Sequence, residues 1–147
     1  MRMFALRALT IGAAFAIAWI VYMVAMVLTV YDGLLSLIFQ PIMAVFCSAF
    51  VVGVAVAFGQ LLRLPLLSRW WNATGAWALV LILGSLFLLC FGYHIGLVET
   101  YTDPETGCSF QALHSGVALG SYFALIFAIA NWPLRKYGIS LSASDEL

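Results

Sequence analysis

The stretch ALHSGVALGSYFALIFAIA, residues 112–130, decides the fold, because it is apolar and places a small residue at every fourth position. These small residues are Ala112, Gly116, Gly120, Ala124 and Ala128. About 20 apolar residues are enough for a helix to cross the hydrocarbon core of a membrane. Small residues let such helices approach one another closely in lipid. The stretch therefore predicts a membrane helix that packs against a neighbour along this row.

The composition of the whole chain is typical of a membrane protein. Of its 147 residues, 65% are hydrophobic and 8% are charged, and the mean hydropathy is +1.11. Soluble domains are about 45–50% apolar and about 25% charged. Long apolar segments lie at about residues 8–30, 34–62, 76–98 and 112–132. Because backbone amides in lipid must be satisfied within each segment, we expect helices. The sequence thus predicts one all-α domain, residues 1–147, that forms an integral membrane four-helix bundle.

The first two apolar segments are longer than a simple span requires. Arg2 and Arg7 precede the first segment like the basic start of a signal peptide, but the apolar part of such a peptide has only about 7–15 residues. We therefore expect an uncleaved anchor. The second segment, as one helix, would be about 43 Å long and would overshoot a core of about 30 Å. Pro41 lacks an amide proton, so a kink is expected there, with the residues before it along the outer interface.

Charge is sorted along the chain although the formal net charge is zero. All six basic residues lie before the first span, between the second and third spans, or after the fourth span: Arg2, Arg7, Arg63, Arg69, Arg135 and Lys136. The other two connections carry acidic residues instead: Asp32, Glu99, Asp103 and Glu105. Basic residues near span ends stay in the cytoplasm, so both termini are expected there, in a multi-pass protein of the inner membrane. Aromatic residues fit two interfaces, with Trp70, Trp71, Trp77 and Trp132 inside and Tyr31, Tyr93 and Tyr101 outside.

Small residues at four-residue spacing recur in the other spans. The third span has Gly92 and Gly96, and the second has Ala49, Gly53 and Ala57. Such a row drifts by about 40° per step, which favours a partner that crosses at roughly −40°. In the third and fourth spans a histidine lies on the side opposite the glycines, so each helix has two faces that avoid lipid. This pattern predicts a homo-oligomer, and the alternative is packing within a single chain.

Polar residues concentrate in the outer half of the expected bundle. No carboxylate, lysine or arginine falls within a span, and the mid-depth groups are hydroxyls and thiols such as Ser48, Ser85, Tyr122, Cys47 and Cys90. The outer polar cluster is expected to contain Gln40, Tyr93, His94, His114, Glu99 and Cys108. Two imidazoles with a carboxylate or thiol could bind zinc or copper, and two imidazoles alone could hold haem iron. The alternative is that His94 and His114 are hydrogen-bonded structural residues.

Several functional classes remain open from the sequence. No nucleophile elbow, phosphate loop or metalloprotease motif is present, so an enzyme has no support, and no nucleic-acid partner is expected. The leading hypothesis is a non-enzymatic inner-membrane protein that acts by helix association, as a subunit, scaffold or sensor, with itself or with another membrane protein. A transporter with a path between subunits is the second hypothesis. A redox protein with haem or metal at His94 and His114 is the third.

Overall fold

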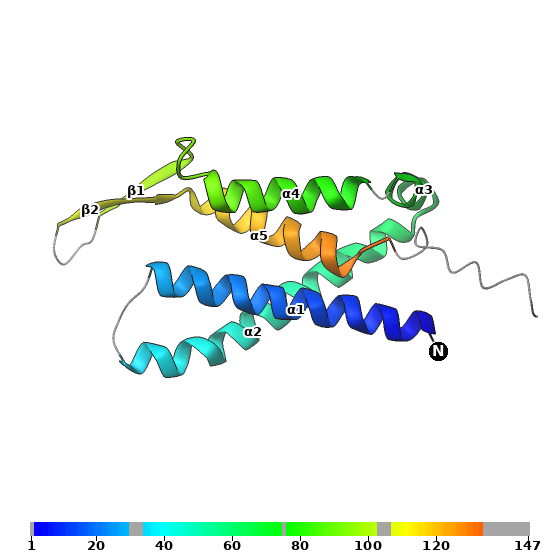
Figure 1. The fold of residues 1–147 in the computed structure, drawn as a ribbon, viewed down its shortest axis with the longest axis horizontal. Helices are drawn as coiled ribbons and strands as arrows, with labels where there is room; N and C mark the ends of the chain where they lie inside the picture. The colour runs from blue at the N-terminus through cyan, green and yellow to red at the C-terminus, as the bar shows by residue number, and fades with distance from the viewer. Residues whose placement is uncertain (1, 30–33, 75, 103–106, 134–147) are drawn as a thin grey trace, which may run out of the picture.

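The computed structural model describes residues 2–29, 34–74, 76–102 and 107–133. Within these residues the chain is mostly helical, with five α-helices, one 3-10 helix and one antiparallel pair of strands (Figure 1). The elements in chain order are α1 (Arg2–Thr29), α2 (Leu34–Gly59), η1 (Gln60–Arg63), α3 (Pro65–Thr74), α4 (Ala76–Phe91), β1 (Val98–Thr102), β2 (Ser109–Leu113) and α5 (Ser115–Ala130). The expected helical character is confirmed.

Two helical stretches in the described part of the chain are long and apolar enough to cross a membrane. They are Phe4–Val27 in α1 and Ile38–Leu62 in α2 and η1. A third would be present if α3 and α4 were one bent span, and α5 is apolar but shorter. With 16 residues each, α4 and α5 are helices of about 24 Å, which is less than a core of about 30 Å. The length and composition of α1 and α2 are therefore compatible with a protein that resides in a membrane.

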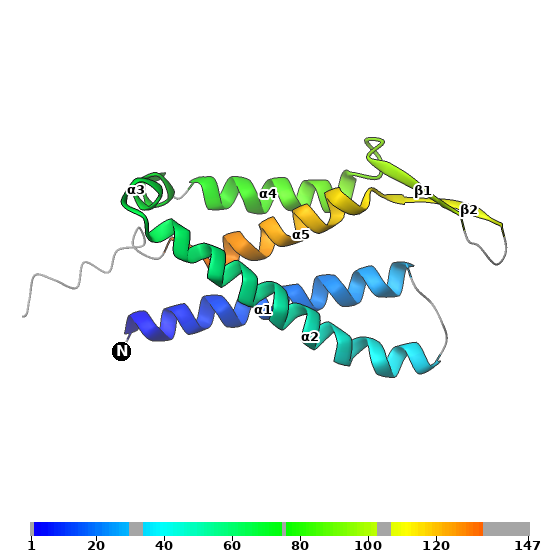
Figure 2. The same ribbon diagram turned by 180° about the vertical axis from the view of Figure 1, so that it is seen from behind.

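The helices pack through small side chains. Ala14 and Ala18 of α1 and Ala55 of α2 are fully buried, and they meet Ile126 and Ala130 of α5 in one core cluster. Residues this small let helix backbones approach closely, which is how helices associate in lipid. α4 lies beside α5, and the β1–β2 hairpin extends from the end of this pair (Figures 1 and 2). The N-terminus of α1 and helix α3 lie at the opposite end.

The second helix runs through Pro41 without a break. α2 is one helix from Leu34 to Gly59, and Pro41 lies inside it. The indole Nε1–H of Trp19 in α1 donates to the carbonyl of Pro41 at 3.4 Å, which ties α1 to this part of α2. The helix therefore begins before the proline, and the kink expected from the sequence stays a prediction.

The third and fourth apolar segments are shorter helices than the sequence predicts. α4 ends at Phe91 rather than near residue 98, and Gly96 adopts φ +85°. The Leu97 N–H donates to the Gly92 carbonyl and the Gly96 N–H to the Tyr93 carbonyl, which is the Schellman pattern that ends helices at glycine. Gly96 thus terminates the helical turn, and its expected packing against a helix stays a prediction.

The connection between α4 and α5 contains an antiparallel hairpin of β1 and β2. β1 pairs with β2 in an antiparallel register that sets Tyr101 opposite Phe110, and their rings stack with centroids 5.8 Å apart. Aromatic and β-branched residues favour such cross-strand pairs. Ala112 therefore lies in β2, and α5 begins only at Ser115. The placement of Ala112 in a membrane helix is corrected. Asp103 and Glu105 lie outside the described residues.

Candidate functional site

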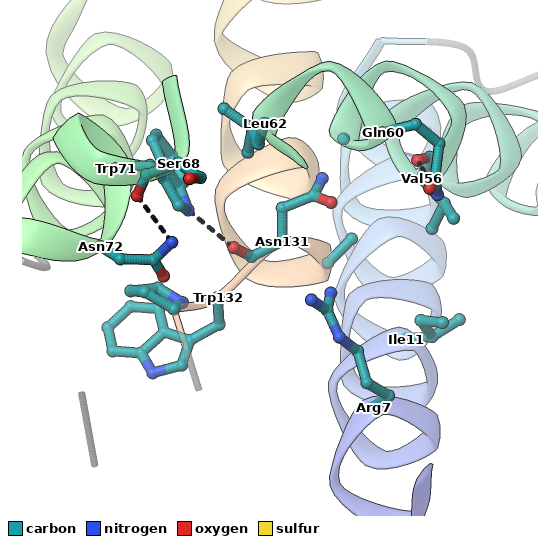
Figure 3. Close-up of a pocket in the computed structure, with 13 residues that line it drawn as sticks. Arg7, Ile11, Val56, Gln60, Leu62, Ser68, Trp71, Asn72, Asn131 and Trp132 are labelled. Carbon is teal, nitrogen blue, oxygen red and sulfur yellow. Dashed lines mark hydrogen bonds between the residues drawn. The ribbon is translucent and has the colours of Figure 1, made fainter. Parts of the chain in front are cut away.

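A cavity of about 590 Å³ opens at the end of the bundle where α1 begins. Its walls come from α1, α2, α3, η1 and the end of α5 (Figure 3). Its polar wall residues are Arg7, Gln60, Ser68, Asn72 and Asn131. Its size is within the range of about 300–1,000 Å³ that is usual for small-molecule sites. We therefore treat this cavity as the candidate site.

Asn131, the residue that ends α5, joins three helices beside the cavity. Its side-chain Nδ2 donates to the carbonyls of Ala55 in α2 at 2.9 Å and Phe127 in α5 at 3.0 Å. The indole Nε1–H of Trp71 in α3 donates to the main-chain carbonyl of Asn131 at 2.9 Å (Figure 3). The side chain is only 8% exposed. Because unpaired polar groups are costly in such a setting, these bonds hold α2, α3 and α5 in register.

Gly59 makes room for this amide. A Cβ atom at residue 59 would overlap the Oδ1, Cγ and Nδ2 atoms of Asn131. Gly59 is itself buried at the end of α2, just before η1. A glycine here therefore allows the α2 backbone to approach the end of α5 closely enough for the amide to reach Ala55.

Arg7 brings a positive charge to the cavity. Its guanidinium points from α1 toward Asn131 (Figure 3). The described residues include one carboxylate, that of Glu99, which lies in β1 at the opposite end of the bundle. Within the described residues the guanidinium thus has no acidic partner, and its N–H donors are available to an anion.

Amide oxygens are available around the same cavity. The Gln60 amide nitrogen donates to the Val56 carbonyl at 3.3 Å, and the Asn72 amide nitrogen donates to the Ser68 carbonyl at 2.8 Å. Asn131 uses its amide nitrogen in the same way. An amide that donates through nitrogen leaves its oxygen as an acceptor. The wall therefore combines one cation with several hydrogen-bond acceptors.

The opposite end of the bundle carries the outer polar cluster, of which Glu99 is the centre. Its Oε2 accepts from the Ser115 N–H at 3.3 Å, the Ser115 hydroxyl at 3.1 Å and the Tyr101 hydroxyl at 3.0 Å. His114 is the N-cap of α5, and its Nδ1 accepts from the Gly116 N–H at 3.1 Å. A carboxylate and an imidazole therefore cap the first turn of α5 together.

We expect the Glu99 carboxyl to titrate below the ordinary pKa of glutamate, and its hydrogen bonds to be lost when it is protonated. The Ser115 amide, then the Tyr101 and Ser115 hydroxyls, lower the pKa of Glu99 from 4.5. Because the folded pKa is lowered, the capping contribution is present above the ordinary value and is lost as pH falls through the lowered one. The Ser115 amide resonance should report this midpoint by NMR, and Glu99→Gln should abolish it. Ser115→Ala should keep part of the shift, and a midpoint at or above 4.5 would contradict this account.

The other residues of the expected outer cluster lie on three separate segments of the chain. The His94 ring contacts Tyr93 edge-on with centroids 5.9 Å apart, and Cys108 is exposed just before β2. Gln40 lies on α2, next to Pro41. In the part of the chain that the structure describes, no three His, Cys, Asp or Glu side chains gather in a way that could hold a metal ion. Zinc, copper or haem at His94 and His114 stays a prediction.

The small-residue rows divide between inner and outer faces. Gly120 is exposed, Ala124 is half-buried and Ala128 is fully buried, so the row on α5 turns from the surface into the bundle. Gly116 is exposed beside the His114 ring. Gly92 is buried, and a Cβ there would lie 2.7 Å from Cδ1 of Leu113 in β2. The absence of a side chain at Gly92 therefore lets Leu113 of the hairpin pack against the end of α4. From the sequence, a helix was expected to pack against this glycine.

Comparison with protein-family models, with curated proteins and with solved structures finds no match to this chain. Asn131 and Gly59 were not singled out by the sequence. The available signal for Asn131 was its position, because it is a polar residue between an apolar helix and Trp132-Pro133. A polar residue at the end of an apolar helix needs a hydrogen-bond partner. Gly59 has no comparable signal, because its role depends on a contact with a residue far along the chain.

Proposed function

We propose that the protein is a non-enzymatic, multi-pass inner-membrane protein that acts by helix association, with α1, α2, α4 and α5 as a four-helix membrane bundle. Both termini are cytoplasmic in this proposal. Arg7 and Arg69 lie at the end of the bundle where α1 begins, together with Trp71 and Trp132, whereas Glu99 lies at the other end. Basic residues and tryptophans at one end support this orientation. Arg135 and Lys136 lie outside the described residues.

The observation that carries the association proposal is an open row of small residues on α2. Ala49, Gly53 and Ala57 are exposed, and a Cβ atom at Gly53 would meet nothing within 4 Å. The packing of α2 inside the bundle uses a different face, where Ala44 and Ala55 are fully buried. A row that is open in one chain offers a second helix the close approach that drives association in lipid. We propose a second copy of this chain as the partner, in a homo-oligomer, with another membrane protein as the alternative.

We expect Gly53→Leu to weaken self-association by about tenfold or more, because the added side chain blocks close helix approach. Native mass spectrometry of the protein in detergent, across a dilution series, would measure the change in copy number. Gly84→Leu is the matched control, since Gly84 is also exposed with nothing near its Cβ position but lies on α4 outside any such row. Equal oligomer populations for both variants, or a monomeric unmodified protein, would contradict the proposal.

Transport of a small solute is the second candidate function, and one observation favours it. Ser48 is fully buried, and its Oγ makes no hydrogen bond of ordinary geometry among the described residues. Tyr122 lies beside it and donates its hydroxyl to the carbonyl of Ala18 at 3.1 Å. A buried hydroxyl without a well-formed hydrogen bond is uncommon and could contact a passing polar group. The mid-depth residues otherwise lack charged groups, so association remains the better supported function.

A further inference from the structure

We propose that the cavity beside Arg7 and Asn131 binds the phosphoethanolamine headgroup of a membrane lipid. In this assignment the Arg7 guanidinium holds the phosphate, and the side-chain oxygens of Gln60, Asn72 and Asn131 accept hydrogen bonds from the ammonium group. The lipid headgroup and soluble phosphoethanolamine share the same chemistry, a phosphate ester with an N–H donor a few atoms away. Of these two ligands, we assign the lipid.

The depth of the cavity fits a headgroup. Arg7 lies three residues after Phe4, where the candidate span of α1 begins, so its backbone is about 5 Å inside that span. Two indoles, those of Trp71 and Trp132, line the cavity, and tryptophan prefers the depth of the membrane interface. The cavity therefore lies at the level where the phosphate of a lipid meets the acyl region.

The cavity also changes character along its depth. Ile11 and Val56 line it about one helical turn further into the bundle than Arg7 and Gln60. Polar groups thus line the end near the interface, and aliphatic side chains line the deeper end. A phospholipid has this same order of groups, whereas a soluble phosphate ester offers nothing for the aliphatic part of the wall.

The charge of the wall decides between headgroups. A guanidinium without an acidic partner among the described residues favours an anion, and its planar fork matches a phosphate. Asn131 donates both of its amide N–H groups to main-chain carbonyls, and Gln60 and Asn72 donate one each, so three amide oxygens remain as acceptors against two amide N–H donors. An ammonium group has three donors and satisfies such acceptors. A choline group also carries a positive charge but has no N–H donor, so the choline lipid tests whether these hydrogen bonds matter.

The test uses the full-length protein, purified in detergent and stripped of lipid. Native mass spectrometry would measure the binding of phosphatidylethanolamine, phosphatidylcholine and phosphatidylglycerol with identical acyl chains, and of soluble phosphoethanolamine. We expect phosphatidylethanolamine to bind at least about tenfold more tightly than the choline and glycerol lipids, since hydrogen bonds to a charged group are the stronger kind. We expect the same margin over soluble phosphoethanolamine, because it has no acyl chains to contact Ile11 and Val56. Equal binding of the choline or glycerol lipid would overturn the headgroup assignment. Equal binding of soluble phosphoethanolamine would overturn the lipid assignment.

Two variants locate the binding in this cavity. Arg7→Gln should weaken phosphatidylethanolamine binding by about tenfold or more, through loss of the charged contact. Arg69→Gln is its matched control, because Arg69 is exposed on α3 and does not line the cavity. Gln60→Leu should reduce the preference for ethanolamine over choline while leaving the phosphate contact in place. Unchanged binding in Arg7→Gln, or an equal loss in Arg69→Gln, would contradict the proposal whatever the copy number of the protein.

Discussion

Gly59→Ala is expected to lower the free energy of unfolding by about 3 kcal/mol. The new methyl group would occupy the position of the Asn131 side chain, which cannot leave without giving up its bonds to Ala55 and Phe127. Overpacking a close contact costs about 1–3 kcal/mol, and a buried polar group without a partner costs a similar amount. The alanine gains about 1 kcal/mol of helix propensity, which offsets only part of this loss. Reversible unfolding in mixed micelles, followed by tryptophan fluorescence, would measure the difference.

Gly53→Ala is the matched control for this substitution. Gly53 lies on the same helix, and a Cβ there meets nothing within 4 Å. We expect its stability to be unchanged or raised by up to about 1 kcal/mol. A loss for Gly53→Ala equal to that for Gly59→Ala would mean that any alanine on α2 is harmful, and the contact with Asn131 would not be the cause.

A double-mutant cycle separates the contact from the general effect of each substitution. Asn131→Ala removes the side chain that the methyl group would strike, and this variant alone should be destabilised because the bond to α2 is lost. Adding Gly59→Ala in that background should then cost little. The expected coupling is about 2 kcal/mol, within the range for residues in contact. Additive losses would show that the two residues do not interact.

The helical part of the fold was predictable because apolar length is a strong signal in lipid. α1 and α2 follow from runs long enough to cross a membrane, whatever the local propensities. The ends of α4 and α5 were predicted less well. Apolar residues continue from α4 into the turn at Gly96 and from β2 into α5, so hydropathy alone does not mark where the helices stop. The glycine conformation and the strand pairing decide those ends.

The candidate site was predicted only in part, because its geometry depends on contacts across the chain. Arg7, Trp71 and Trp132 were expected at one interface from charge and aromatic patterning. The cavity that joins them depends on Asn131 reaching Ala55, residues 76 positions apart in the sequence. Periodicity and composition carry no information on a pairing of that kind. At the other end, Glu99 and His114 were expected near one another, and both contribute to the capping of α5.

The orientation of the bundle in the membrane decides which of its two ends faces the cytoplasm. The basic residues that flank the spans are expected to stay in the cytoplasm during insertion, so we expect the end with Arg7 and the cavity to face inward. We then expect the connection that contains the hairpin, with Glu99 and Tyr101 in β1, to face outward. Orientation is all-or-none for each molecule, so the expected signal of a topology reporter is large.

Reporter fusions measure this orientation most directly. Green fluorescent protein and alkaline phosphatase would each be fused after Leu147 and, in a second pair, after Gly107 in the hairpin connection. We predict fluorescence without phosphatase activity for the fusions after Leu147, and phosphatase activity without fluorescence for those after Gly107. Phosphatase activity after Leu147 together with fluorescence after Gly107 would contradict the account, because the basic end of the bundle would then face outward.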